Sequence, residues 1–559
     1  MGRISRRRVL QGMAAGAGAL AVGAGGRLAW SAPGVNWPET RPDPSRPEGI
    51  DTMPEVEHIV IYMQENHSYD SYFGMLPFGD GYTLGPDGRP TDSNPDGSGG
   101  SVGVFRADSG CQTGRGVSQS WDATHRQYDG GAMDGFYATS GLNAMKYWDD
   151  TLLPFYWDLA RTFVLCDRWF ASAPCQTYPN RRYLQAATSA GIVSTSLTAI
   201  ESTQTAPNGT IWDRLNAHGI SWLDYAYDLP EILLFPTTYN TYKDHVRTIP
   251  NFLADAAAGT LPRVSLVSPG FNSYTEENPH DVQLGEAFTA RIVNAVMDGP
   301  GWEKTVMFFM YDEHGGYYDH VPPPAAIAPD SYAPQTTVPP DAPGGFDRYG
   351  MRVPGFVISP FAKPDHVSST VYDHTSVLRF IETKYNLGAM TYRDANANDL
   401  VDTLDFKTVA FREPPTLAAP GLPASGSACE PGIKDPKTIR PVTGAPSPPP
   451  VPVTTTTVAK VPSSTTRPGS TTSTTSTTIV KGSTTTTTSS TVPRSTTTEP
   501  PITKQLAALQ RKNDGPGDGF AGMIGATAVA AGFIALAAKY RGDGPADDGA
   551  TDPASPSSA

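Results

Sequence analysis

The sequence predicts an α/β domain between about residues 55 and 415, built on a mainly parallel β-sheet that helices cover on both faces. Two observations lead to this fold class. Several short runs are apolar throughout rather than at alternate positions, which is typical of strands buried on both sides. Helix-like patterns lie between these runs, and strands that alternate with helices predict a parallel sheet.

Three apolar runs predict core strands of this sheet. They are residues 58–63, 305–311 and 353–358. Between the first two runs, residues 285–297 place apolar side chains on one helical face, which predicts a helix that packs on the sheet. A second helix is predicted to start near Thr177 and to run to about Ser189, because Pro179 suits the first turn of a helix.

The composition excludes several classes of protein. The 559 residues carry 42 Lys and Arg against 56 Asp and Glu, a formal net charge of −14. Nucleic-acid binding needs a basic face, so nucleic acid is not an expected partner. The 4 cysteines are too few for a disulfide scaffold or a cysteine-rich zinc module. Cys429 could tie the tail to Cys111, while Cys166 and Cys175 flank the segment before Thr177; other pairings and free thiols stay open.

Residues 1–31 have the features of a twin-arginine export signal. Arg6 and Arg7 precede a short, weakly apolar run of alanine and glycine, residues 12–29. The alternative is a basic cap on a membrane helix, which the weak hydrophobicity of the run disfavours. The twin-arginine export machinery is therefore an expected partner of this chain.

The segment after the predicted domain differs sharply in composition. Residues 416–450 form a tail that contains Cys429, and residues 451–502 are mostly Thr, Ser and Pro. Such a stretch cannot bury enough apolar surface to fold. We expect residues 451–502 to be a disordered stalk, and whether it carries O-linked glycans stays open.

A membrane anchor is predicted near the C-terminus. Residues 520–538 carry no charge and have the length of a transmembrane helix, with a buried amphipathic helix as the alternative. Because Lys539 and Arg541 follow this run, residues 539–559 are expected in the cytoplasm. Signal, stalk and anchor together predict an extracytoplasmic head held at the cell membrane.

Acidic and amide side chains follow two of the predicted strands. Glu65 and Asn66 come after the first strand, and Asp312 and Glu313 come directly after the second. Ligands bind at the carboxyl ends of parallel strands, so these four side chains converge if the two strands are neighbours. Their oxygens suit one hard divalent cation, with Ca²⁺ as the first expectation and Mg²⁺ or Mn²⁺ as alternatives. The competing interpretation is a set of solvated acids at strand ends.

Thr177 lies at or just before the predicted helix start, where the helix dipole and free N–H groups favour an anion. A hydroxyl at that place can cap the helix. It can also act as a nucleophile toward phosphorus when a metal activates it. Arg181 follows one turn later and could hold a phosphate by two hydrogen bonds, or form a surface ion pair.

These segments resemble the motifs of the bacterial phosphoesterase family, which includes bacterial and plant non-specific phospholipases C and a related metal-dependent acid phosphatase. The matching segments, in the order of the family, are residues 64–74, Trp121 with His125, residues 133–136, 167–172, 177–181, 280–282 and 311–322. Together they span the predicted domain, and their combination is highly specific although each alone is weak.

The resemblance implies an alkaline-phosphatase-like α/β fold with a single metal ion. Glu65, Asn66, Asp312 and Glu313 match the metal ligands of the family. Thr177 matches the nucleophile, which also touches the metal.

The resemblance also implies the groups that handle the phosphate. His125 and His280 match histidines that bind phosphate or move protons. The candidate substrate-binding side chains are Arg181, Asn180, His314 and His320. Residues 276–280 lack the His-Pro pair that the family often has just before this point, so the resemblance leaves one phosphate contact of the family unassigned.

The activity that the resemblance implies is that of a phospholipase C, which converts phospholipids to diacylglycerol and a phosphorylated head group. The phosphatase branch carries serine at the nucleophile and the phospholipase branch threonine, so Thr177 favours a phospholipid substrate. Thr177 would form a phosphothreonine intermediate, and His280 or His125 would protonate the leaving oxygen. The alternatives are an acid phosphatase on the same site and, from another class, a surface-anchored binding module, which the complete set of acids disfavours.

Overall fold

The computed structural model describes residues 35–112, 116–203, 205–271, 274–336, 341–421 and 429. The predicted export signal, stalk, membrane anchor and cytoplasmic tail lie outside the described residues. Within the described ranges, no helix is long and apolar enough to cross a membrane.

The centre of the molecule is an eight-stranded sheet with the order β12-β6-β11-β10-β1-β9-β7-β8. Its central pair consists of β1 (His58–Gln64) and β10 (Thr305–Tyr311), which are buried along their whole length. The other strands of this sheet are β6 (Val164–Cys166), β7 (Trp222–Ala226), β8 (Val246–Thr248), β9 (Val264–Ser268), β11 (Gly355–Ile358) and β12 (His366–Ser368). Continuous burial explains why these strands have apolar residues at every position.

The sheet is mostly parallel, as the sequence predicts. β1 runs parallel to both of its neighbours, β10 and β9. β11 differs, because it pairs in the antiparallel sense with β10 and with β6. It also begins two residues later than predicted, at Gly355 directly after Pro354, which has no N–H to donate to a neighbouring strand.

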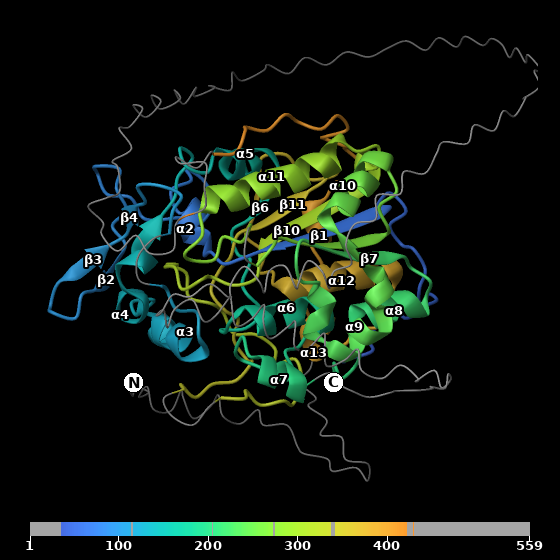
Figure 1. Ribbon diagram of the computed structural model, residues 1–559, viewed down its shortest axis with the longest axis horizontal. Coiled ribbons are helices and arrows are strands. Elements are labelled where there is room, and N and C mark those ends of the chain that lie inside the picture. The colour runs from blue at the N-terminus through green and yellow to red at the C-terminus, as the bar shows by residue number, and fades with distance from the viewer. Residues whose placement is uncertain are drawn as a thin grey trace, which may run out of the picture.

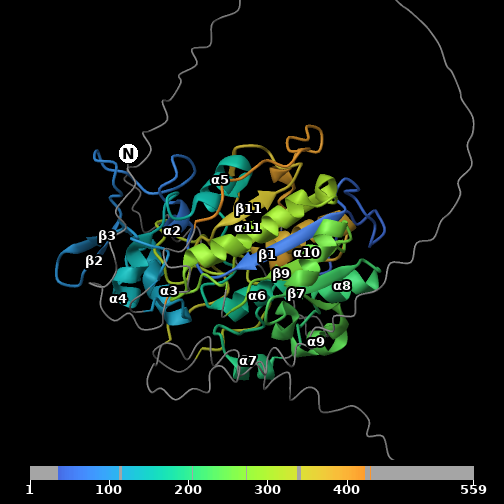
Figure 2. The ribbon, with the colours of Figure 1, turned by 45° about the horizontal axis from the view of Figure 1, so that its top comes forward.

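Helices cover both faces of the sheet (Figures 1 and 2). One face carries α5 (Pro154–Thr162), α10 (Ile249–Ala258) and α11 (Val282–Asp298). The opposite face carries α6 (Thr177–Ala186), α8 (Ile211–Ala217), α9 (Pro236–Tyr242), α12 (His374–Tyr385) and α13 (Tyr392–Ala395). This two-sided cover confirms the predicted α/β class.

Shorter elements gather mainly beyond the carboxyl end of the central strands. The helices are α2 (Tyr69–Phe73), α3 (Trp121–Tyr128), α4 (Phe136–Ser140) and α7 (Leu197–Ser202). The small strands are β2 (Ser93–Pro95), β3 (Ser101–Gly103), β4 (Phe105–Arg106) and β5 (Lys146–Tyr147). Figure 1 shows β2, β3, α3 and α4 together at one end of the molecule.

The two predicted helices form with shifted ends. α6 begins at Thr177 but ends at Ala186 rather than near Ser189, because Ala187 has a left-handed φ of 56° that stops the helix. α11 begins three residues before the predicted start, because the Asp281 side chain accepts a hydrogen bond from the Gln283 N–H and caps the helix there.

A disulfide joins Cys111 to Cys429 across 318 residues of sequence, which is the tail pairing that the sequence left open. Cys166 and Cys175 are buried free thiols. Cys111 also pairs by backbone with Asp281, so the disulfide fastens the tail beside the start of α11.

Candidate active site

The two predicted ligand segments lie side by side. β1 and β10 are parallel neighbours in which Gln64 pairs with Tyr311. The Asp312 N–H then donates to the Gln64 carbonyl at 3.1 Å, which continues the ladder one step past the strands. This register brings Glu65 and Asp312 to the same edge of the sheet, as expected for the carboxyl ends of parallel strands.

Five buried or partly buried carboxyl groups gather at this edge, and one guanidinium contacts three of them. We call this group the acid cluster; it consists of Glu65, Glu231, Glu277, Asp312 and Glu313, with Arg181 among them. Arg181 donates from Nε to Asp312 Oδ2 at 2.8 Å and from Nη1 to Glu231. Its Nη2 lies 3.9 Å from Glu65 Oε1. One cation therefore faces several acids, so the cluster has an excess of negative charge when the acids ionise.

Helix α6 carries Thr177 to the acid cluster. Thr177 and Arg181 are four residues apart and so share one face of the helix, and Arg181 contacts Asp312 and Glu65. Cys175 lies two residues before Thr177, and the pKa of its thiol is raised by burial and then by the charge of Glu313. The helix N-cap is Gln176, so the Thr177 hydroxyl does not cap the helix, and this removes the alternative that the sequence left open.

Two buried groups of the predicted ligand set have unused hydrogen-bonding capacity. Asn66 is fully buried, and neither its amide oxygen nor its amide nitrogen has a partner. Glu313 Oε1 is likewise buried without a partner, while Oε2 accepts from the Gly315 N–H at 2.8 Å. Buried polar atoms without partners are costly, and a ligand that binds them removes the cost.

Gly315 makes the close approach of these segments feasible. Its φ is +66°, and a Cβ at this position would lie 2.2 Å from the Asn66 carbonyl oxygen. Any other residue would push the Glu313 segment away from Asn66. The glycine that follows the two acids is therefore part of the architecture of the site.

The donor set fits a hard divalent cation. It offers carboxylate oxygens from Glu65, Asp312 and Glu313 and the unpartnered amide oxygen of Asn66, which are the ligands that Ca²⁺, Mg²⁺ and Mn²⁺ prefer. In the described part of the chain, the carboxylate oxygens of Glu65, Asp312 and Glu313 do not all lie within 4.8 Å of one another. A bound ion would thus have to draw them closer together.

Burial dominates the acid–base behaviour of the cluster. Desolvation raises the pKa of Glu277 to about 7, and the negative charge of Asp312 adds to the effect. Desolvation also raises the pKa of Asp312 to about 6, against the opposing charge of Arg181. Burial also raises the pKa of Glu65, against the charge of Arg181 and with that of Asp312, and it raises the pKa of Glu313 together with the charge of Asp312.

We expect the chelated protein to become less stable as the pH rises from about 5 to about 8. Because the folded-state pKa values lie above the unfolded ones, the folded chain binds protons that the unfolded chain releases. This contribution is complete below the usual carboxyl pKa and is lost as the pH rises through the raised values. Thermal unfolding with chelator across this range measures it, and added Ca²⁺ should reduce the loss. A melting temperature that is flat or rises with pH in chelator would contradict this.

The other predicted residues fall into different surroundings. His314 is buried, contacts Gln127 Oε1 through Nε2 at 2.8 Å, and has its pKa lowered to about 3 by burial. Asn180 is also buried, and its side chain bonds to the backbone of Ala173, Cys175 and Gln176. Asn180 therefore holds the loop that leads to Thr177, and its use as a direct substrate contact stays a prediction.

The two predicted acid–base histidines lie on elements that border the site. His280 is partly buried three residues after Glu277, and its carbonyl accepts from Gln112. His125 lies on α3, with Nδ1 2.7 Å from the Trp121 carbonyl, and burial lowers its pKa. Their roles in proton transfer stay predictions.

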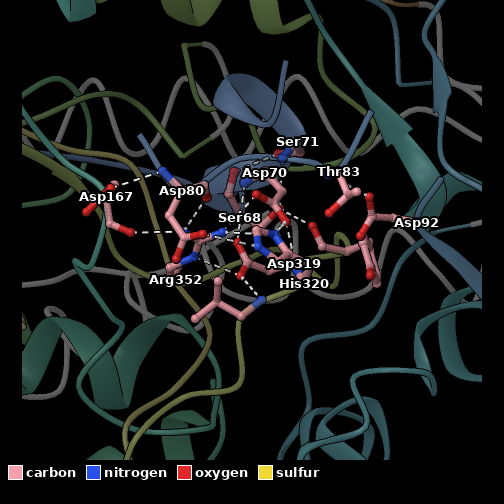
Figure 3. Close-up of polar contacts among 12 residues, drawn as sticks. Ser68, Asp70, Ser71, Asp80, Thr83, Asp92, Asp167, Asp319, His320 and Arg352 are labelled. Atoms are coloured by element: carbon pink, nitrogen blue, oxygen red, sulfur yellow. Dashed lines mark hydrogen bonds and ion pairs between the residues drawn. The ribbon is translucent and has the colours of Figure 1, made fainter. Parts of the chain in front are cut away.

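His320 belongs to a second polar cluster, which Figure 3 shows around Arg352. Its Nδ1 lies 2.7 Å from Asp70 Oδ2. The buried Arg352 donates to Asp70 Oδ1 at 2.8 Å and to Asp319 Oδ1 at 2.9 Å. Burial lowers the pKa of His320, but Asp70 outweighs this effect and raises it to about 9. His320 and Arg352 thus balance the charges of Asp70 and Asp319. The ligand atoms of Asp70, Asp319 and His320 also lie within 4.8 Å of one another, a spacing that could hold a metal ion.

Three residues of the site were not identified from the sequence. Glu231 binds Arg181, and His374 Nε2 lies 2.8 Å from the Asp312 carbonyl. Both are far from the motifs in sequence, and no local pattern marks them. Glu277 lies in the segment where the His-Pro pair is missing, and that departure was the signal that could have identified it.

The chain is similar in sequence to known proteins. A model of the Phosphoesterase family matches residues 56–388. Non-specific phospholipase C1 of Arabidopsis thaliana is 31% identical over 379 residues, which cover 61% of this chain and 69% of that protein. Non-hemolytic phospholipase C of Pseudomonas aeruginosa is 29% identical over 411 residues, with coverage of 63% and 58%. Phospholipase C A of Mycobacterium tuberculosis is 29% identical over 436 residues, with coverage of 66% and 81%.

Among solved structures, a protein of the alkaline phosphatase superfamily from Vibrio parahaemolyticus aligns with a TM-score of 0.30 and 14% identity. The alignment covers 59% of this chain and 77% of that one. A TM-score at this level is too low to support an argument about the fold.

Proposed function

The chain belongs to the Phosphoesterase family and is a hydrolase homologous to phospholipases C, and on that premise we propose that it cleaves phospholipids to diacylglycerol and a phosphorylated head group. One observation carries the proposal: Thr177 starts a helix whose next turn contacts the acid cluster. A threonine at a helix start beside hard-cation ligands suits in-line attack on a phosphate ester.

We propose that one divalent cation is held by Glu65, Asn66, Asp312, Glu313 and the Thr177 hydroxyl. Such a cation would lower the pKa of that hydroxyl and offset negative charge on the phosphate. The free N–H groups at the start of α6 add to the attraction for an anion. Arg181 orients Asp312 by a buried hydrogen bond at 2.8 Å, which makes it a positioning residue in this scheme.

The proposed reaction has two covalent steps. In the first, the Thr177 hydroxyl gives its proton to solvent and its oxygen bonds to phosphorus, while the bond from phosphorus to the glycerol oxygen breaks. That oxygen keeps the electron pair and takes a proton from His280 or His125. In the second, water bonds to phosphorus as one histidine accepts its proton. The bond from phosphorus to the Thr177 oxygen then breaks, and that oxygen keeps the electron pair and takes a proton from solvent.

An assay with two substrates tests the proposed function. The purified full chain with Ca²⁺ should release diacylglycerol from phosphatidylcholine vesicles. Chelation should remove the activity because the acids then lack the cation. A chain that cleaves p-nitrophenyl phosphate but leaves phosphatidylcholine intact would be a phosphomonoesterase. A chain that cleaves neither substrate with Ca²⁺, Mg²⁺ or Mn²⁺ would be a binding module.

We also propose that the enzyme works outside the membrane, exported by the twin-arginine signal and anchored by residues 520–538. Protease treatment of intact cells should release a soluble, active head by cleavage within residues 451–502, since that segment has the composition of an unfolded stalk. The fragment with residues 520–538 should stay in the membrane. A head that resists protease until the cells are lysed would contradict export.

A further inference from the structure

Glu276 is a buried carboxylate on which three tyrosine hydroxyls converge. Tyr72 and Tyr311 donate to its Oε2 at 2.6 and 2.7 Å. Tyr156 donates to its Oε1 at 2.5 Å. Both side-chain oxygens of Glu276 are therefore held by hydrogen bonds, which fix the orientation of the group.

The three tyrosines come from three separate elements. Tyr72 lies on α2, next to the first ligand segment. Tyr156 lies on α5, which packs beside α11. Tyr311 ends β10 and is followed directly by Asp312. Glu276 therefore ties the segments after β1 and β10 to the helical layer on one face of the sheet.

The backbone around Glu276 is fastened to Glu65. The Glu276 N–H donates to the Glu65 carbonyl at 2.9 Å. The Thr275 hydroxyl donates to Glu65 Oε2 at 2.9 Å and accepts from the Glu277 N–H at 2.9 Å. Residues 275–277 thus orient a proposed metal ligand on one side and place Glu277 in the acid cluster on the other.

The carbonyl of Glu276 has two further partners. Gln112 Nε2 donates to it at 2.6 Å, and His67 Nε2 lies 3.2 Å away. Gly285 of α11 leaves room for the side chain, because a Cβ there would lie 2.1 Å from Glu276 Cγ. The space beside Gly285 therefore accommodates the Glu276 side chain. The side-chain oxygens, the N–H and the carbonyl of Glu276 all have hydrogen-bond partners.

We propose that Glu276 is a positioning residue that sets the geometry of the cation site through Glu65 and through Tyr311, which precedes Asp312. This inference rests on the proposed function, since it assumes that those two acids hold a cation. Mutation of a side chain that orients a metal ligand typically lowers metal affinity by about 10- to 100-fold.

The experiment measures Ca²⁺ and Mn²⁺ binding to the full chain by calorimetry, in Glu276→Ala, Glu276→Gln and Tyr311→Phe. Glu276→Ala should weaken binding of the cation at least about tenfold. Glu276→Gln keeps the volume and one acceptor oxygen, so it should restore a large part of the affinity. Tyr311→Phe removes one donor and should weaken binding by a smaller factor in a chain that folds normally.

Glu286→Ala is the matched control. Glu286 is a buried carboxylate that accepts from the N–H groups of Phe155, Tyr156 and Gly421 and contacts no proposed ligand. Its replacement should lower the melting temperature without changing the cation affinity of the folded protein. If Glu276→Ala binds as tightly as the parent, or Glu286→Ala weakens binding equally, the inference is wrong. If Glu276→Ala does not fold, an unchanged affinity in Tyr311→Phe overturns it. A parent that binds neither ion overturns the proposed function as well.

Discussion

Thr177→Ala is expected to abolish turnover, with a loss in rate on the order of 10⁴-fold or more, because the variant lacks the oxygen that would bond to phosphorus. The fold should persist. Gln176 is the N-cap of α6 and the helix continues through Tyr178 and Pro179, so its start does not depend on the Thr177 hydroxyl. Diacylglycerol release from phosphatidylcholine vesicles measures the effect, and circular dichroism checks that the variant is folded.

Thr177→Ser is the control for this prediction. It keeps a hydroxyl at the same position, so it should retain a measurable part of the activity, and an acid quench should trap a phosphoserine in place of the phosphothreonine. Ca²⁺ affinity should fall only modestly in Thr177→Ala, because four other ligands remain. Turnover by Thr177→Ala within a few-fold of the parent would remove Thr177 from the mechanism and leave water as the direct nucleophile.

The parts of the site that could be predicted are those that follow from local sequence. The runs at residues 58–63 and 305–311 are largely apolar, which predicts buried strands there, and acids follow both. Since parallel strands end at the same edge, the meeting of Glu65 with Asp312 follows once the two strands are neighbours, which the structure shows. The start of α6 at Thr177 follows in the same way from Pro179 in the first turn.

The parts that could not be predicted depend on contacts between distant segments. His320 lies in a family motif, yet its partner Asp70 is 250 residues away and Arg352 decides the charge balance around both. The direction of β11 was hidden for a similar reason, because a buried strand has the same apolar pattern in either direction. Motif membership thus identifies a residue as part of the architecture but does not say whether it faces the substrate.

Arg181 illustrates the same limit with a larger consequence. The sequence predicts a phosphate contact or a surface ion pair, and the structure buries the guanidinium completely. Its donors are used by Asp312 and Glu231, and its Nη2 also faces Glu65. These carboxylates raise the pKa of Arg181 against the effect of its burial, so it stays charged in the fold. Arg181 holds Asp312 in place. Its contact with the phosphate stays a prediction.

Arg181→Met is therefore expected to destabilise the chelated protein by about 3–5 kcal/mol, the usual cost of leaving buried charges without their partner. The loss should be smaller near pH 5 than near pH 8, because the acids of the cluster are protonated at the lower pH and then need no counter-charge.

Arg182→Met is the matched control on the same helix. Arg182 is equally buried, but within the part of the chain that the structure describes its hydrogen bonds go to Thr203, and no carboxylate acts on its pKa. Urea unfolding of both variants at the two pH values measures the difference. Equal losses for the two arginines, independent of pH, would mean that Arg181 contributes packing rather than charge balance to the acid cluster.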